Sequence, residues 1–331
     1  MAETGREAST RHLGLDLGGT NIKAVVVEHV GDDWRVLDRD QVGTPAAQGP
    51  DRVVARLAEV GAEAIGRCPG VTSVGIGIPG LYDPAAGTTR FLVNIPGAWA
   101  GKPVAGPVGD ALSLPAAMIN DARAFGLAEL RLGAGRGARA MIGFTLGTGV
   151  GGVIAIDGRI YQGRDGTGGE MGHQTLDPEG PPCGCGNRGC LEAYARADRI
   201  AEACGTRTVE DAIERARAGD ARARAGLERV GRYLGVGIAN MITAITPQRV
   251  VLGGGVAASA DLLLDTIRDE VRRHVFTTSL EGVEIVTAEL GTWAGAIGAA
   301  IHGAERAEAG RSAAPARRAG GTGARAGAGA A

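Results

Sequence analysis

DLGGTNIKAVVV, residues 16–27, is the stretch from which the fold of this 331-residue chain is inferred. The apolar residues from Leu13 to Leu17 predict a short buried strand, the glycines break it, and Ile22 to Glu28 predict a second strand. TLGTGVGGVIAI, residues 145–156, repeats this order with the same turn chemistry. The repeat indicates a weak internal duplication within an α/β chain.

The glycine turns of both copies are suited to bind phosphate. Glycine lets backbone N–H groups point at phosphate oxygens at close range, and Thr20 adds a hydroxyl donor. Asp16 is placed to hold Mg²⁺ through water. A plain hairpin explains a single turn equally well, and none of the turns has the Walker pattern. A third glycine turn, residues 253–255, precedes a predicted helix, and three such turns favour a bound nucleotide.

Residues 168–192, GGEMGHQTLDPEGPPCGCGNRGCLE, hold too much glycine and proline for a regular helix or strand. Cys183, Cys185 and Cys190 form a C-x-C-x4-C cluster, and His173 lies ten residues upstream of it. Three thiolates and one imidazole make a closed tetrahedral set that suits a structural Zn²⁺. Buried small residues and a redox pair are the alternatives, and the spacing favours zinc.

Asn120-Asp121 stands where an apolar strand, residues 116–119, ends and a helix begins. A carboxylate at the end of a strand in an α/β sheet faces the ligand crevice. Phosphoryl transfer to an alcohol requires a residue that accepts the hydroxyl proton, so Asp121 is predicted to be a general base. The alternative is a helix N-cap, a common role for aspartate at such a position.

The rest of the chain alternates predicted strands and helices. Apolar spacing predicts a helix over residues 51–67, whereas residues 81–115 are predicted to be irregular because of their Gly, Pro and Asn content. Residues 1–11 and 305–331 are predicted to be a disordered leader and a disordered Ala/Gly/Arg tail. The other predicted strands are 34–41, 72–78, 249–252 and 283–287, and the other predicted helical segments are 121–132, 196–245, 260–275 and 293–304.

The bulk composition argues against several classes of protein. The net charge is only −2 and 44% of residues are hydrophobic, so we expect neither a nucleic-acid partner nor a membrane partner. The polar first ten residues do not resemble a secretory signal, and no apolar run reaches the roughly 18 residues of a membrane span. Cys68 and Cys204 lie far from the cysteine cluster and are interpreted as ordinary thiols. We therefore predict a cytoplasmic protein.

Several motifs together resemble the ROK family, which comprises repressors, open reading frames and sugar kinases. They are DLGGT at 16–20, GIGIPG at 75–80, MINDARA at 118–124, TLGTGVGG at 145–152 and GEMGHQTLDPEGPPCGCGNRGCLEA at 169–193. The resemblance implies the actin-like ATPase fold, a duplicated ribonuclease H-like fold with two α/β domains around a cleft. It places one domain at residues 12–119, completed by the final helix 293–304, and the other at 120–292 with the zinc-bearing loop 168–192.

The resemblance also implies a role for individual residues. Asp121 resembles the catalytic base. Arg123 departs from the family pattern, which often has small residues here, and this departure leaves room for crowding or an extra salt bridge. The implied sugar ligands are Gly80, Asn94, Asn120, Asp121, Glu170, His173 and Glu192, and the implied zinc ligands are His173, Cys183, Cys185 and Cys190. The implied ATP and Mg²⁺ site comprises Asp16, Gly18, Gly19, Thr20, Lys23, Gly147, Thr148, Gly149, Gly254 and Gly255.

The function expected from this resemblance is an ATP-dependent hexose kinase, and among these a glucokinase that acts on the 6-hydroxyl. Fructokinase, a kinase of N-acyl or amino hexoses and a polyphosphate glucokinase remain alternatives. A sugar-responsive repressor is disfavoured, because the 15 residues before Asp16 are too few for a DNA-binding module. The family commonly forms dimers, so a homodimer or higher homo-oligomer is expected.

Overall fold

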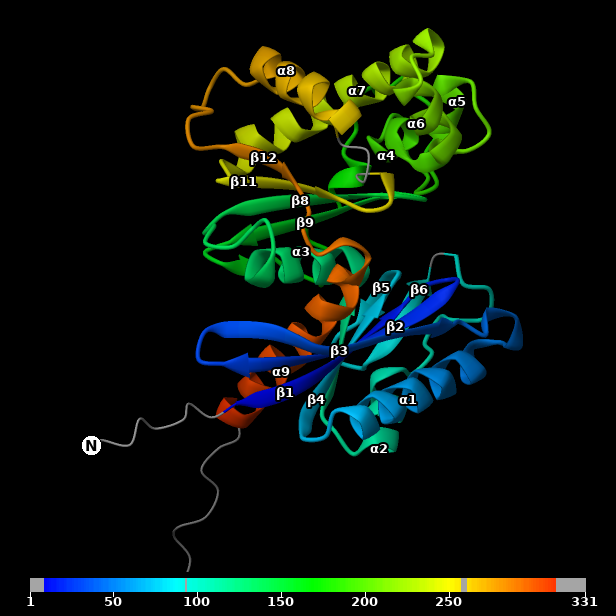
Figure 1. Ribbon diagram of the computed structural model, residues 1–331, viewed down its shortest axis with the longest axis vertical. Coiled ribbons are helices and arrows are strands. Elements are labelled where there is room, and N and C mark those ends of the chain that lie inside the picture. The colour runs from blue at the N-terminus through cyan, green and yellow to red at the C-terminus, as the bar shows by residue number, and fades with distance from the viewer. Residues whose placement is uncertain (1–8, 93, 257–260, 314–331) are drawn as a thin grey trace, which may run out of the picture.

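Two mixed β-sheets of five strands each form the framework of the residues that the computed structural model describes, 9–92, 94–256 and 261–313 (Figure 1). We call them the N-terminal sheet, with strand order β3-β2-β1-β4-β7, and the C-terminal sheet, with order β10-β9-β8-β11-β12. The strands of the N-terminal sheet are β1 (Thr10–Leu17), β2 (Asn21–Val30), β3 (Asp33–Gly43), β4 (Val71–Ile78) and β7 (Ala116–Asn120). Those of the C-terminal sheet are β8 (Met141–Leu146), β9 (Val150–Ile156), β10 (Arg159–Ile160), β11 (Arg249–Gly253) and β12 (Glu284–Thr287).

The two sheets share one topology. β1 pairs antiparallel with β2 and parallel with β4, and β8 pairs antiparallel with β9 and parallel with β11. Asp16 lies opposite Lys23 across the first hairpin, as Thr145 lies opposite Gly151 across the second. The common strand order and directions confirm the duplication predicted from the two glycine turns.

Helices cover both faces of the N-terminal sheet. α1 (Pro50–Arg67) and α2 (Ala105–Leu112) pack on one face, and α9 (Ala294–Ala313) packs on the other (Figure 1). α1 starts with a proline, which is tolerated there because the first helical N–H groups have no intrahelical acceptor. Its buried Val53, Leu57 and Val60 recur at helical spacing and form a core with β1 and β4.

The C-terminal sheet lies between α3 (Asp121–Leu132) and a group of helices on its other face (Figure 1). Ile142, Phe144 and Leu146 alternate along β8, so all three side chains point to the face that those helices bury. The helices of this group are α4 (Glu192–Ala195), α5 (Ala197–Cys204), α6 (Val209–Arg217), α7 (Ala221–Ile245) and α8 (Leu264–His274).

α3 and α9 pack against each other and join the two halves (Figure 1). A methyl group at Gly298 of α9 would overlap the Ala124 carbonyl oxygen of α3. One at Gly75 of β4 would likewise overlap the Ala299 carbonyl of α9. The Gly- and Ala-rich sequence of α9 is therefore explained by backbones that approach without side chains between them.

Residues 81–115 are not irregular as predicted. They contain most of a hairpin, β5 (Gly80–Asp83) and β6 (Thr88–Leu92), and the helix α2. The hairpin is short, and its bulge between Leu81 and Tyr82 disturbs the alternation that would reveal a strand in the sequence.

Both predicted termini also need correction. β1 begins at Thr10, within the predicted leader 1–11. α9 continues to Ala313, so the predicted disorder of residues 305–313 is wrong. Ala, Glu and Arg are good helix formers, and Arg131 of α3 pairs with Glu305 at 2.8 Å. The remaining parts of these predictions, residues 1–8 and 314–331, lie outside the described residues, as does residue 260 of the predicted helix 260–275.

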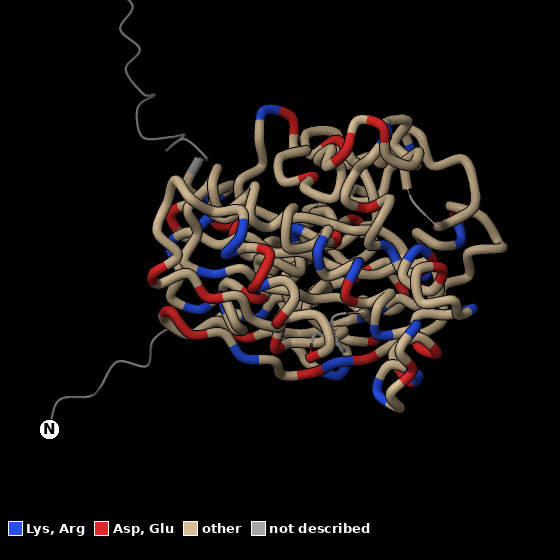
Figure 2. The backbone as a smooth tube through the Cα atoms, turned by 90° about the horizontal axis from the view of Figure 1, so that it is seen from above, with Lys and Arg blue, Asp and Glu red and all other residues tan. Residues whose placement is uncertain are grey.

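Charged residues are interspersed along the backbone, in keeping with the small net charge (Figure 2). Among the helices of the described residues, none combines the length and the apolar character needed to cross a membrane.

Candidate active site and metal centre

The junction of β7 and α3 orients the predicted base. Asn120, and not Asp121, caps the helix: its Oδ1 accepts the Ala122 and Arg123 N–H groups at 3.0 and 3.2 Å. Its Nδ2 donates to the Gly80 carbonyl at 3.1 Å and to Asp121 Oδ1 at 3.0 Å. Asp121 is therefore the first helical residue. Its carboxylate accepts from Asn120, whose side chain is itself bonded to the first N–H groups of the helix and to the Gly80 carbonyl.

The Asp121 carboxyl is electrostatically unusual. Solvent reaches it, yet protein atoms surround it closely enough that desolvation is the main cause that raises its pKa to about 7. The charges of Asp16 and Glu170 raise this pKa further, and the Ala122 N–H and the Arg123 guanidinium partly offset them. The structure thus brings together three predicted site carboxylates, one from each of three separate segments.

Asp16 lies on β1 and faces the first turn of α9, where a methyl group at Gly295 would meet its carboxylate. Burial raises the pKa of Asp16 to about 6, and the charge of Lys23 lowers it in part. Lys23 itself donates from Nζ to the Thr292 carbonyl at 2.6 Å and lies over the Trp293 ring at 5.8 Å. The predicted nucleotide-site lysine is therefore attached to the segment that leads into α9.

The three glycine turns lie at the ends of β1, β8 and β11. In the first, Gly18 N–H donates to the Asn21 carbonyl at 2.9 Å, and Gly19 lies against the backbone of Asn94. In the second, the side chain of Asn94 donates to Thr148 Oγ1 at 3.3 Å. Asn94, which has a positive φ of 62°, therefore bridges the turns of the two halves.

The third turn packs on the second. Gly254 has a φ of 90°, and a side chain there would overlap the backbone of Leu146, the residue before the 147–149 turn. The parallel pairing of β11 with β8 brings these two turns to the same edge of the sheet. Thr20 and Gly255 are exposed at the ends of their turns.

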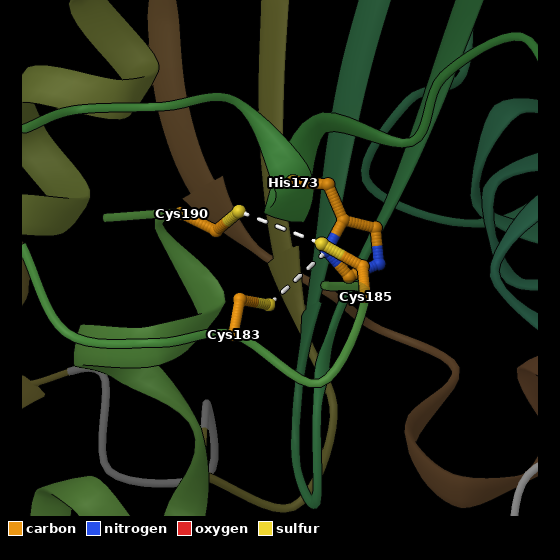
Figure 3. Close-up of side chains that lie close together, drawn as sticks. All are labelled: His173, Cys183, Cys185 and Cys190. Carbon is orange, nitrogen blue, oxygen red and sulfur yellow. Dashed lines mark hydrogen bonds between the residues drawn. The ribbon is translucent and has the colours of Figure 1, made fainter. Parts of the chain in front are cut away.

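The predicted metal ligands converge on one point (Figure 3). The donor atoms of His173, Cys183, Cys185 and Cys190 all lie within 4.8 Å of one another. Cys183 Sγ is 3.6 Å from His173 Nδ1, and Cys185 Sγ is 3.7 Å from Cys190 Sγ, much too far for a disulfide. His173 ends a short 3-10 helix, Met171–His173, that follows Glu170 directly.

The two glutamates that flank this cluster have different partners. Glu170 Oε1 accepts from Arg123 Nη2 at 3.1 Å. Glu192, at the start of α4, accepts the Val150 N–H at 3.0 Å through Oε2, while its Oε1 lies 3.6 Å from Cys183 Sγ. Glu192 thus connects the cysteine cluster to the second glycine turn.

Arg123 is a residue of this site that the sequence singled out only as a departure from the family pattern. Its side chain is 1% exposed and donates to the Gly168 carbonyl as well as to Glu170. Of the two expected consequences of an arginine here, crowding or an extra salt bridge, the structure shows the salt bridge.

Comparison with known proteins places the chain in a family. Residues 12–305 match the sequence profile of the ROK family. The chain belongs to the ROK family. Among ROK relatives, a protein of Halalkalibacterium halodurans named glucokinase is 34% identical over 315 residues, which cover 87% of this chain and 93% of the relative.

Solved ROK structures agree with the fold. The ROK hexokinase of Thermus thermophilus matches with a TM-score of 0.79 and 37% identity, over 91% of this chain and 100% of that one. The ROK glucokinase of Streptomyces griseus, solved in complex with glucose and AMPPNP, matches with a TM-score of 0.75 and 31% identity, over 90% and 100%. The chain has the actin-like ATPase fold predicted from its motifs.

Proposed function

We propose that this chain is an ATP-dependent hexose kinase and that it phosphorylates the 6-hydroxyl of glucose. The observation that carries the proposal is the Asp121 carboxyl at the start of α3, whose pKa is raised to about 7 beside Asp16 and Glu170. A base with a pKa near the working pH is well matched to the transfer of a hydroxyl proton. The relatives named glucokinase, and the glucose complex of one of them, support glucose as the sugar.

In the proposed reaction, Asp121 accepts the proton of the sugar hydroxyl as the oxygen attacks the γ-phosphorus of ATP. The bond from that phosphorus to the β–γ bridging oxygen breaks, and ADP leaves with the electron pair. The turns 18–20 and 147–149 hold the phosphates through backbone N–H groups, and the 253–255 turn lies near the adenosine. Asp16 would hold a hydrated Mg²⁺, which would neutralise charge on the phosphates. The proposed sugar ligands are Gly80, Asn94, Asn120, Asp121, Glu170, His173 and Glu192.

We also propose that the cysteine cluster holds a structural Zn²⁺. A tetrahedral ion with Zn–S of about 2.3 Å and Zn–N of about 2.0–2.1 Å sets sulfur–sulfur separations of about 3.8 Å and sulfur–nitrogen separations of about 3.6 Å. The separations of 3.7 Å between Cys185 and Cys190 and 3.6 Å between Cys183 and His173 fit these values. With four protein ligands the ion has no open position, so its role is to fix the loop that carries Glu170 and Glu192.

A panel of substrates tests the hexose-kinase proposal. Purified protein is assayed for transfer from ATP or polyphosphate to glucose, fructose, mannose, glucosamine and N-acetylmannosamine, and the product is identified by NMR. We expect the highest kcat/KM with glucose and ATP and a phosphate on the 6-oxygen. Preference for fructose, an amino or N-acyl hexose, or polyphosphate would select one of the alternatives, and a lack of transfer to every sugar would refute the proposal.

A further inference from the structure

Arg123 is a buried cation that pairs with Glu170, one of the proposed sugar ligands. Its side chain is 1% exposed, whereas that of its partner Glu170 is 39% exposed. Burial of an unpaired guanidinium is strongly unfavourable, so its contacts must compensate for lost hydration. Even so, Arg123 Nη1 is buried without a hydrogen-bond partner among the described residues.

The contacts that Arg123 makes are directed at one short turn. Nε and Nη2 both donate to the Gly168 carbonyl, at 3.1 and 2.9 Å, and Nη2 also donates to Glu170 Oε1 at 3.1 Å. The planar fork of arginine fixes both acceptors relative to each other, which a flexible ammonium group cannot do. Arg123 thus bonds the backbone of Gly168 and the carboxylate of Glu170 at the same time.

The opposite side of the turn 168–170 is fixed by β9. A side chain at Gly152 would overlap the Gly169 carbonyl oxygen, and Gly169 itself has a φ of 95° that favours glycine. The turn is therefore held between a strand of the C-terminal sheet and the guanidinium of Arg123. Arg123 lies in the same first helical turn as Asp121, and Asn120 caps that turn.

We propose that Arg123 is a positioning residue for hexose binding, which fixes Glu170 and the Gly168 carbonyl relative to Asp121. This inference rests on the proposed hexose-kinase function and adds a residue that holds one of its sugar ligands. The charges that act on Asp121 come from three elements. Asp16 of β1 and Glu170 of the turn are negative and raise its pKa, whereas Arg123 of α3 is positive and lowers it. Lys23, across the hairpin from Asp16, acts on Asp16. Removal of Arg123 leaves Asp121 among carboxylates, so the carboxyl should lose its proton only at a higher pH.

Two substitutions separate positioning from charge. In Arg123→Gln, we expect the glucose Kd, measured by calorimetry without nucleotide, to rise about 10- to 100-fold. We expect the acid limb of its kcat profile to move up by about 0.5–1 pH unit. Arg123→Lys keeps the charge without the fork, so its acid limb should stay at the wild-type pH while its glucose Kd lies between those of wild type and Arg123→Gln.

Arg131→Gln is the matched control. Arg131 lies on the same helix and also bonds a backbone carbonyl, that of Gly158, and a carboxylate, that of Glu305. The substitution Arg131→Gln should lower Tm without changing the glucose Kd or the acid limb of the kcat profile. The proposal is overturned if Arg123→Gln lowers Tm but leaves the glucose Kd within twofold of the wild-type value and the acid limb of the kcat profile in place.

The calorimetric readout separates this inference from the proposed function. If the wild type binds glucose without transferring phosphate, the kinase proposal fails and the Kd values of the variants still decide the role of Arg123. If the wild type binds none of the hexoses, both proposals fail.

Discussion

The two glycine turns occupy equivalent places in the two sheets, yet they have different chemistry. Two residues before its first glycine, the N-terminal turn has Asp16, whereas the C-terminal turn has Thr145. Burial raises the pKa of Asp16 to about 6. The C-terminal turn is instead braced by Glu192, which accepts the Val150 N–H and lies beside Cys183. The duplication thus supplied two similar loops, of which one carries a charged group and the other is attached to the cysteine cluster.

The same division extends to the rest of the site. The N-terminal sheet presents carboxylates at the ends of strands, Asp16 on β1 and Asp121 after β7. The C-terminal half presents Glu170, His173 and Glu192 from the loop that carries the cysteine cluster. In the proposed enzyme, Asp121 accepts the proton and Asp16 binds Mg²⁺, while the loop of the C-terminal half adds Glu170, His173 and Glu192 to the sugar ligands.

The largest effect is expected from Asp121→Asn, which removes the proposed base. We expect kcat to fall about 10²- to 10⁴-fold, much more than the loss of the sugar contact weakens glucose binding. The folded state raises the pKa of Asp121, so protonation of this group favours folding and that contribution is lost as pH rises through about 7. Asp121→Asn should therefore raise Tm relative to wild type more at pH 8 than at pH 5. Near-normal turnover would show that another group accepts the proton.

A smaller effect should distinguish the two turns directly. Asp16→Asn removes the charged group of the first turn and should lower kcat by about 10²-fold. Thr145→Val removes the hydroxyl at the equivalent position of the second turn and should reduce kcat far less. Steady-state kinetics of both variants at saturating Mg²⁺ provide the comparison. Equal losses in the two variants would refute the division of roles.

Cys190→Ser tests whether a zinc ion at the cysteine cluster fixes the sugar-binding loop of the C-terminal half. We expect less than half an equivalent of zinc by elemental analysis and a glucose Kd at least about tenfold weaker, because the loop with Glu170 and Glu192 is no longer fixed. Cys204→Ser is the control, since Cys204 is buried between α5 and α7, away from the cluster. Full zinc content in Cys190→Ser, or no zinc in the wild type, would contradict the metal assignment.

Gly298→Ala tests the junction of the halves, with the smallest expected effect. The added methyl overlaps the Ala124 carbonyl oxygen, so we expect a loss of about 1–3 kcal/mol of unfolding free energy. Gly310→Ala, in the same helix with open space around it, should instead stabilise by about 0.5–1 kcal/mol. Denaturant unfolding of both variants measures the difference. If Gly298→Ala were as stable as wild type, the close contact of α3 and α9 would be disproved.

The sequence predicted the features that depend on local chemistry. The glycine turns, the strand end at Asn120 and the spacing of the cysteines each carry a signal within a few residues. The contacts between Arg123 and Gly168 and between Glu192 and Val150 span 45 and 42 residues, and no local pattern reveals them.

Other features were missed for a different reason. The β5–β6 hairpin is short and bulged, so its alternation is weak. The last turns of α9 consist of the residues that also suggested a disordered tail. The bond from the Lys23 ammonium group to the Thr292 carbonyl spans 269 residues, and no local pattern reveals it.

The pH dependence of kcat tests most directly whether Asp121 is the base of a hexose kinase. A base must be unprotonated, so kcat for glucose phosphorylation should fall as the pH drops through about 7. Because the charge of Asp16 raises the pKa of Asp121, the acid limb of Asp16→Asn should lie at lower pH than that of the wild type. An acid limb near pH 4 in the wild type, or one that Asp16→Asn leaves in place, would contradict this account.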